Sequence, residues 1–146
     1  MIAFHTTVAV RRPLPDVFAY VADPRTFPAW NSAVQAVTST SAGPADAGAT
    51  YAMERQLPGG RALNDLEIVA YEPPVEFAIR TTAGPTPFHY RYRFAAQDGH
   101  TVVALDAEVE LSGVAAIAPA LARRAVKRGV DDNLATLKRT LEAASG

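Results

Sequence analysis

The sequence contains no cysteine, and this absence removes several kinds of chemistry at once. Disulfide bonds, thiolate metal ligands and cysteine nucleophiles all require that side chain. An excess of charge of one sign is also missing, because 14 Lys and Arg residues oppose 15 Asp and Glu residues. A net charge of -1 provides no overall attraction for a polyanion, so we predict no nucleic-acid partner.

Long apolar runs are absent as well. The first 12 residues lack the apolar centre of a signal peptide, and no stretch reaches the roughly 20 residues of a membrane-spanning helix. We therefore expect a cytoplasmic location and no stable membrane insertion. The three histidines, His5, His89 and His100, are scattered without metal-ligand spacing, so we predict no metal site and no cofactor.

What the sequence does contain is a series of short segments in which apolar and polar residues alternate. Such alternation, interrupted by turns rich in Pro and Gly, predicts β-strands. Two short helical segments and one long one complete the pattern, and 146 residues fit a single domain, residues 1–146. The predicted strands are 2–10, 34–40, 49–57, 61–72, 76–81, 88–94 and 103–111, and the predicted helices are 14–22, 24–30 and 115–143.

The alternation predicts a sheet with one covered face and one face in water. The element long enough to cover it is the last helix, which has apolar residues at helical spacing. We therefore predict an α+β fold in which a curved antiparallel sheet of about six or seven strands surrounds the long C-terminal helix. The predicted stripe on this helix is Leu121, Ala125, Val130, Leu134, Leu137 and Leu141, and the predicted covered strand residues include Phe77, Ile79, Tyr90, Tyr92, Val103 and Leu105, with Glu76, Arg91 and Glu108 exposed.

Three local motifs follow one another along nearly the whole chain. They are VFAYVADP at 17–24 followed by Trp30, YEPP at 71–74 followed by Phe77, and NL, LK and LE at 133–134, 137–138 and 141–142. In order and spacing they resemble the SRPBCC (START-like) superfamily with its helix-grip fold, and most of all its polyketide cyclase/dehydrase-like branch. The resemblance implies a deep cavity between sheet and helix for lipids, sterols, polyketides or other aromatic molecules. Its members range from carriers to cyclases, so the fold does not specify the activity.

Candidate ligand-binding residues lie on the predicted covered face of the strands, on the long helix and at Trp30. Tyr90 and Tyr92 are either core residues or ligand contacts, because buried hydroxyls need partners. Arg55 and Asn64 are in phase with apolar neighbours, so each is either a rim residue or a polar contact inside the cavity. The full predicted set is Trp30, Met53, Arg55, Asn64, Leu66, Phe77, Ile79, Phe88, Tyr90, Tyr92, Val103, Leu105, Ala118, Leu121, Ala122, Ala125 and Gly129.

Small residues in the first half of the long helix suggest where the cavity lies. A Gly inside a helix, such as Gly129, lowers helix stability by about 1 kcal/mol relative to Ala. We therefore expect a structural role for this residue. Small side chains that face large aromatic ones either allow close packing or leave a space for a ligand. We predict a cavity beside Ala118, Ala122, Ala125 and Gly129, with close packing as the alternative.

Three functions are compatible with these patterns. The first is a binding or carrier domain for a small hydrophobic or aromatic molecule. The second is a cofactor-free cyclase or dehydratase that acts in the same cavity by positioning a reactive chain. The third is a protein-partner module that uses a sheet edge or the basic residues Arg123, Arg124, Lys127 and Arg128. A homodimer is a further alternative for the partner. The in-phase candidates are mostly Phe, Tyr, Leu and Ile rather than acid–base pairs, which favours binding.

Overall fold

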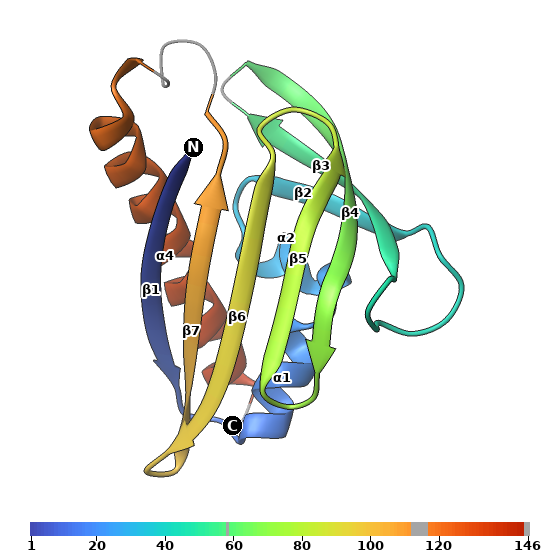
Figure 1. Cartoon of the computed structure of the whole chain (residues 1–146). Helices are drawn as coiled ribbons and strands as arrows, with labels where there is room; N and C mark the ends of the chain where they lie inside the picture. The colour runs from blue at the N-terminus through green and yellow to red at the C-terminus, as the bar shows by residue number, and fades with distance from the viewer. Residues whose placement is uncertain (58, 112–116, 145–146) are drawn as a thin grey trace.

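Seven antiparallel strands form one curved sheet in the computed structural model, which describes residues 1–57, 59–111 and 117–144 (Figure 1). The strand order is β1-β7-β6-β5-β4-β3-β2, so the first two strands of the chain form opposite edges. Every predicted strand is present, although Pro58 of one predicted turn lies outside the described residues. The strands are β1 (Ile2–Val10), β2 (Val34–Ser39), β3 (Thr50–Leu57), β4 (Gly60–Glu72), β5 (Glu76–Ala83), β6 (Phe88–Gln97) and β7 (His100–Val109).

Short helical segments connect β1 to β2, as the sequence predicts. They are α1 (Leu14–Val21), the 3-10 turn η1 (Pro24–Thr26) and α2 (Phe27–Trp30). A proline and Asp16 in the first turn of α1 suit the fixed φ and the positive dipole end of that position. The Asp23 side chain accepts a hydrogen bond from the backbone N of Arg25 at 3.0 Å, which starts η1.

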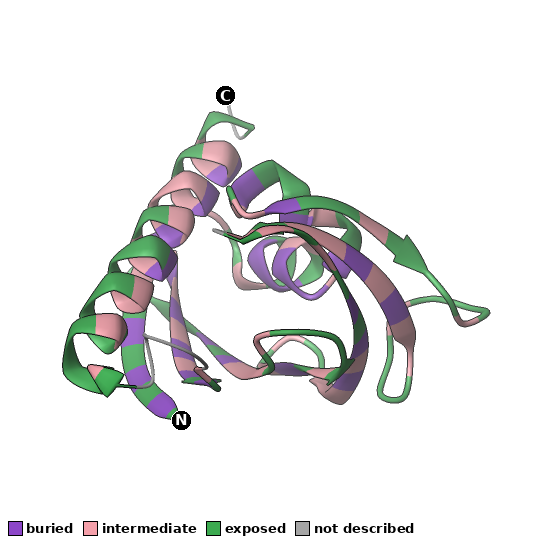
Figure 2. Cartoon of the chain, turned by 90° about the horizontal axis from the view of Figure 1, so that it is seen from above, coloured by how far each residue is buried: buried purple, intermediate pink, exposed green. Residues whose placement is uncertain are grey.

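The long helix α4 (Pro119–Ala143) lies on the concave side of the sheet, beside β1 (Figures 1 and 2). Its predicted start at residue 115 lies outside the described residues. The sheet, the long helix and the short helices after β1 confirm the predicted helix-grip arrangement. Second-half residues of the predicted stripe are buried, namely Val130, Leu134, Leu137 and Leu141.

The first half of the predicted stripe is wrong. Leu121 is 66% exposed and Ala125 is also exposed. Steps of four residues back from Val130 lead to Val126 and Ala122, which are half-buried, so the inner face continues through these two positions. Leu121 directly precedes Ala122, and Ala125 directly precedes Val126. Both are therefore rotated by about 100° around the helix, away from the inner face.

The predicted faces of the strands are confirmed for most positions. Phe77, Ile79, Tyr92, Val103 and Leu105 are buried, Tyr90 is half-buried, and Glu108 is exposed. Glu76 and Arg91 are half-buried rather than exposed, because Arg91 Nη1 lies 2.6 Å from Glu76 Oε2 on the outer face. Arg93 and Asp106 form a cross-strand ion pair of 2.8 Å on the same face. A one-residue slip would invert all these positions, so the predicted phase of the sheet is correct.

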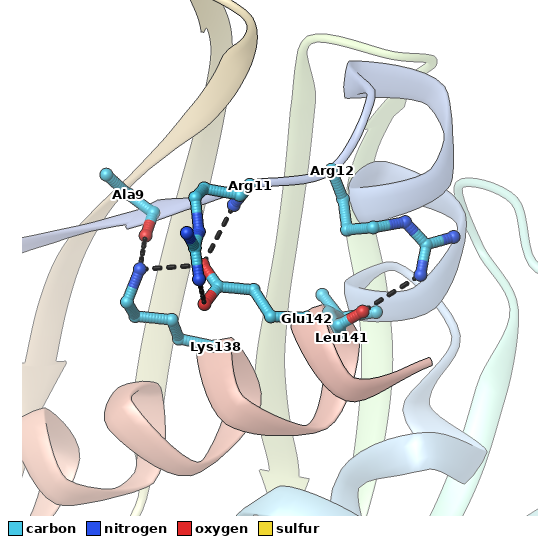
Figure 3. Close-up of polar contacts among 6 residues, drawn as sticks. All are labelled: Ala9, Arg11, Arg12, Lys138, Leu141 and Glu142. Carbon is cyan, nitrogen blue, oxygen red and sulfur yellow. Dashed lines mark hydrogen bonds and ion pairs between the residues drawn. The ribbon is translucent and has the colours of Figure 1, made fainter. Parts of the chain in front are cut away.

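Charged side chains tie the C-terminal end of α4 to the end of β1 (Figure 3). Glu142 accepts a hydrogen bond from the backbone N of Arg11 at 2.9 Å and from Lys138 Nζ at 2.7 Å. Lys138 Nζ also donates to the carbonyl oxygen of Ala9 at 2.8 Å. Lys138, together with Arg11, lowers the pKa of Glu142 to about 2. These contacts hold the half of the helix that carries Leu137 and Leu141 against the sheet.

Candidate functional site

A cavity of about 430 Å³ lies between the concave face of the sheet, α2 and the middle of α4. This volume is in the range of small-molecule binding sites. The wall is formed by α2 and the segment after it, by β3, β6 and the end of β7, by the β5–β6 loop, and by α4. Its residues are Phe27, Trp30, Asn31, Ser32, Ala33, Val34, Met53, Arg55, Leu57, Thr86, Phe88, Tyr90, Tyr92, Val109, Leu111, Val126, Gly129, Val130 and Asn133.

The cavity occupies one end of the concave face, and packed core occupies the other. Strand β6 crosses from one to the other. Phe88, Tyr90 and Tyr92 line the cavity, whereas Phe94 packs against Phe18 of α1 with 5.2 Å between the ring centroids. Helix α1 therefore packs against the concave face of the sheet at the Phe94 end of β6. The cavity lies at the Phe88 end of the same strand.

The structure brings seven of the predicted site residues together on the cavity wall: Trp30, Met53, Arg55, Phe88, Tyr90, Tyr92 and Gly129. Five others share the covered face but are fully buried in the core: Leu66, Phe77, Ile79, Val103 and Leu105. Four at the start of α4 are not part of the wall: the N-cap residue Ala118 and the helix residues Leu121, Ala122 and Ala125. Asn64 is buried behind Arg55. A Cβ at Gly129 would meet no neighbour within 4 Å, so close packing does not explain this glycine.

Several wall residues lie outside the predicted set, although the sequence pattern points to some of them. Leu57 continues the alternation of Met53 and Arg55, and Val109 continues that of β7. Val126 lies one helical turn before Val130, and this spacing places both residues on the same face of α4. The residues between α2 and β2, 31–33, have no periodic pattern, so only the structure places them at the cavity.

Arg55 is held at the wall by three acceptors. Its Nε donates to Oδ1 of Asn64 at 2.9 Å, and its Nη2 donates to the carbonyl oxygens of Pro85 at 2.9 Å and Thr86 at 3.0 Å. The guanidinium carbon lies 5.5 Å from the ring centroid of Phe88, within reach of a cation–π interaction. Burial lowers the pKa of Arg55 from its ordinary value, yet a guanidinium stays charged at neutral pH. The side chain is thus a cation in a fixed orientation.

Asn64 is the residue that fixes this orientation. Asn64 is only 1% exposed, and both the oxygen and the nitrogen of its carboxamide form hydrogen bonds. The Oδ1 accepts from Arg55, while Nδ2 donates to the carbonyl oxygens of Ala83 at 3.2 Å and Pro85 at 2.9 Å. Asn64 therefore connects strand β4, the β5–β6 loop and Arg55 in one hydrogen-bond network. Its role is to position Arg55.

The two tyrosines of β6 place hydroxyl groups beside the cavity. In the part of the chain that the structure describes, neither hydroxyl has a hydrogen-bond partner, although Tyr92 itself is buried. Burial raises the pKa of Tyr90 to about 12, and the positive charge of Arg55 partly offsets this rise. Burial, with a smaller contribution from Tyr90, also raises the pKa of Tyr92. Both hydroxyls are therefore neutral at physiological pH and can donate or accept a hydrogen bond.

The raised pKa of Tyr90 predicts a loss of stability in alkali. Below about pH 10 the folded and unfolded chains both keep the proton, and between about pH 10 and 12 only the folded chain keeps it. The free energy of unfolding should then decrease as pH rises through this range. In Tyr90→Phe the decrease between about pH 10 and 12, measured by urea denaturation, should be smaller than in the original protein. An identical decrease in both proteins would contradict the assignment to Tyr90.

Acid–base and metal-binding groups are scarce around the cavity. Among its described wall residues there is no Asp, Glu, His or Lys. Within residues 1–57, 59–111 and 117–144, no three His, Asp or Glu side chains gather as a metal site would require. No helix in the same part of the chain is both long and apolar enough to cross a membrane. Among the described wall residues, the titratable groups are thus Arg55, Tyr90 and Tyr92.

The fold is shared with solved structures of low sequence identity. A protein from Thermus thermophilus superimposes with a TM-score of 0.80 at 14% identity, covering 99% of this chain and 100% of its own. A START superfamily protein from Mycobacterium smegmatis gives a TM-score of 0.75 at 15% identity, with 97% and 98% covered. The di-domain ARO/CYC StfQ from the steffimycin biosynthetic pathway gives 0.71 at 16% identity; 97% of this chain matches 45% of that protein.

No curated protein sequence matches this chain. A family profile does match, and it covers residues 1–142, which include every element of the sheet and nearly all of α4. That family is described as polyketide cyclase/dehydrase and lipid transport. The predicted resemblance is confirmed, and the chain belongs to the polyketide cyclase/dehydrase and lipid transport family.

Proposed function

We propose that this protein binds a small apolar or aromatic molecule in the cavity between the sheet and α4. The observation that carries the proposal is the composition of the wall. Phe, Tyr, Trp, Val, Leu and Met side chains form most of it, and a few polar groups converge on the same space. Apolar walls with a small number of oriented polar groups are typical of small-molecule sites.

Binding without chemical change is favoured by the groups that the wall lacks. General acid–base catalysis near neutral pH works best with groups that titrate near neutral pH. The wall residues that the structure describes include no carboxylate and no imidazole, and burial moves the tyrosines further from neutrality. A carrier or binding domain requires none of these groups.

A cyclase or dehydratase is the second candidate, because the family description names these enzymes as well as lipid transport. The ARO/CYC name of StfQ points the same way for a protein of this fold. In such an enzyme the cavity would fold a reactive chain so that two of its carbons meet, and Arg55 would stabilise a developing enolate oxygen. Catalysis would then depend on position and charge more than on a strong base.

Ligand uptake tests the proposal directly. We expect native mass spectrometry of the purified protein to show an additional bound mass, and N-phenyl-1-naphthylamine to bind with a rise in fluorescence at a stoichiometry of about one. If the bound compound is recovered unchanged after incubation, the protein is a carrier; loss of water from it indicates a dehydratase. A protein that binds neither a co-purified compound nor the fluorescent probe would contradict both functions and support a partner module.

A further inference from the structure

Arg55 introduces a positive charge into an otherwise uncharged cavity. It is the one charged side chain among the described wall residues, which are otherwise apolar, amide, hydroxyl or aromatic. Within the described part of the chain it has no carboxylate partner, whereas most other arginines of the sheet are paired with Asp or Glu. A partly buried cation without a counter-ion is costly, and an anion from outside the protein would reduce that cost.

The hydrogen bonds of Arg55 show which part of the guanidinium is available. Nε and Nη2 are used by Asn64 and by the carbonyl oxygens of Pro85 and Thr86. Nη1 forms no hydrogen bond with any residue that the structure describes, and it is not enclosed by protein. Two N–H donors therefore remain on a side chain that is otherwise fixed. A group held in this way is suited to bind an oxygen anion without reorganising.

Aromatic side chains lie next to this donor. The Phe88 ring lies under the guanidinium, and the Tyr90 ring follows it along β6 with 4.6 Å between their centroids. The Tyr90 hydroxyl has no partner among the described residues and is close enough to Arg55 for the two charges to interact on ionisation. A flat apolar ligand body could contact the aromatic rings while its oxygens meet Arg55 Nη1.

We propose that the ligand is an organic acid: an aromatic or otherwise flat apolar body with an ionised carboxylate or equivalent oxygen anion that accepts hydrogen bonds from Arg55 Nη1. This inference rests on the proposed function, because it takes the cavity to be the ligand site. It adds the chemical class of the ligand and the atom that selects it. Asn64 is a positioning residue, since it holds Arg55 and lies behind it.

Competition between two isosteric ligands tests the inference. N-phenyl-1-naphthylamine, which is uncharged, reports occupancy of the cavity, and 2-naphthoate or 2-naphthamide displaces it. The two competitors share shape and differ in charge. We expect 2-naphthoate to displace the probe with at least about tenfold higher affinity than 2-naphthamide, since a charge-assisted hydrogen bond is the stronger.

Variants identify the group responsible. Arg55→Met should reduce the preference for the acid over the amide to about twofold or less. Arg61→Gln is the matched control, because Arg61 belongs to the same hairpin but pairs with Glu54 on the outer face. It should keep the full preference. Thermal denaturation checks that each variant folds. If Arg55→Met does not fold, the ratio of the affinities for 2-naphthoate and 2-naphthamide in the original protein tests the inference.

The outcomes separate the two proposals. If the uncharged probe binds but both competitors displace it equally, the organic-acid inference is wrong and the binding function stands. If the acid is preferred equally in Arg55→Met, another group selects it and the inference is also wrong. If the uncharged probe does not bind at all, the proposed binding function itself fails.

Discussion

Gly84→Ala is expected to lower the free energy of unfolding by about 3 kcal/mol, because it combines backbone strain with a steric clash. Gly84 has a φ of +102°, a conformation that Ala adopts only at a cost. A Cβ here would also overlap the carbonyl oxygen of Leu63 and lie 2.6 Å from Asn64 Nδ2. Neither neighbour can move freely, since Leu63 contributes backbone and Asn64 is buried.

Gly99→Ala separates the two contributions. Gly99 is in another hairpin turn and has a φ of +83°, but a Cβ there would meet nothing within 4 Å. Only the backbone strain should appear, about 1 kcal/mol. Urea denaturation of the two variants measures both values. Equal losses would mean that the β5–β6 loop moves away from Asn64 at little cost.

The Gly84 variant also bears on the ligand site. Pro85 and Thr86 follow directly, and their carbonyl oxygens accept the hydrogen bonds that orient Arg55. Displacement of this loop should therefore weaken the hydrogen bonds that orient Arg55, even though Gly84 itself is not on the cavity wall. The close approach of Gly84 to Asn64 is part of the same network that positions the cation.

The strands could be predicted from sequence because each has an independent local signal. Alternation on β6 and β7 determines which side chains share a face, and the turns between strands contain Gly or Pro. The first half of α4 has no equally clear signal for the face that it turns to the sheet. Leu121 is a large apolar residue next to the half-buried Ala122. Its size favours a predicted stripe through Leu121, although Ala122 is the residue on the inner face. Only packing against the sheet determines which of the two faces inward.

The cavity could be predicted as a feature but not located along the sheet. Phe77, Leu105 and Tyr92 share one face and have similar local patterns, yet only Tyr92 reaches the cavity. The difference arises because α1 covers one end of the sheet and not the other, which is a tertiary property. Arg55 was identified by its phase with Met53, but two of its acceptors lie about 30 residues later in a loop, beyond any local pattern.

The inner face of α4 offers a direct way to close the cavity. Val126 lies on the wall at the centre of this face, one turn from Val130, and is only half-buried. Val126→Trp should place a large ring in the cavity that Val126 lines. We expect affinity for N-phenyl-1-naphthylamine to fall by at least tenfold, about 1.4 kcal/mol, whereas the free energy of unfolding should change by less than about 1 kcal/mol because no filled core is disturbed.

Ala125→Trp is the matched control for this effect. It adds the same side chain one residue earlier on the same helix, where Ala125 is exposed and away from the cavity wall. Its affinity for the probe should stay within about twofold of the original protein, which shows that tryptophan on α4 does not by itself prevent binding. Fluorescence titration with excitation outside tryptophan absorption measures affinity, and urea denaturation measures stability. If Val126→Trp instead loses the roughly 1–3 kcal/mol typical of an overpacked core and binds the probe unchanged, then this part of α4 is packed against the sheet and the ligand enters elsewhere.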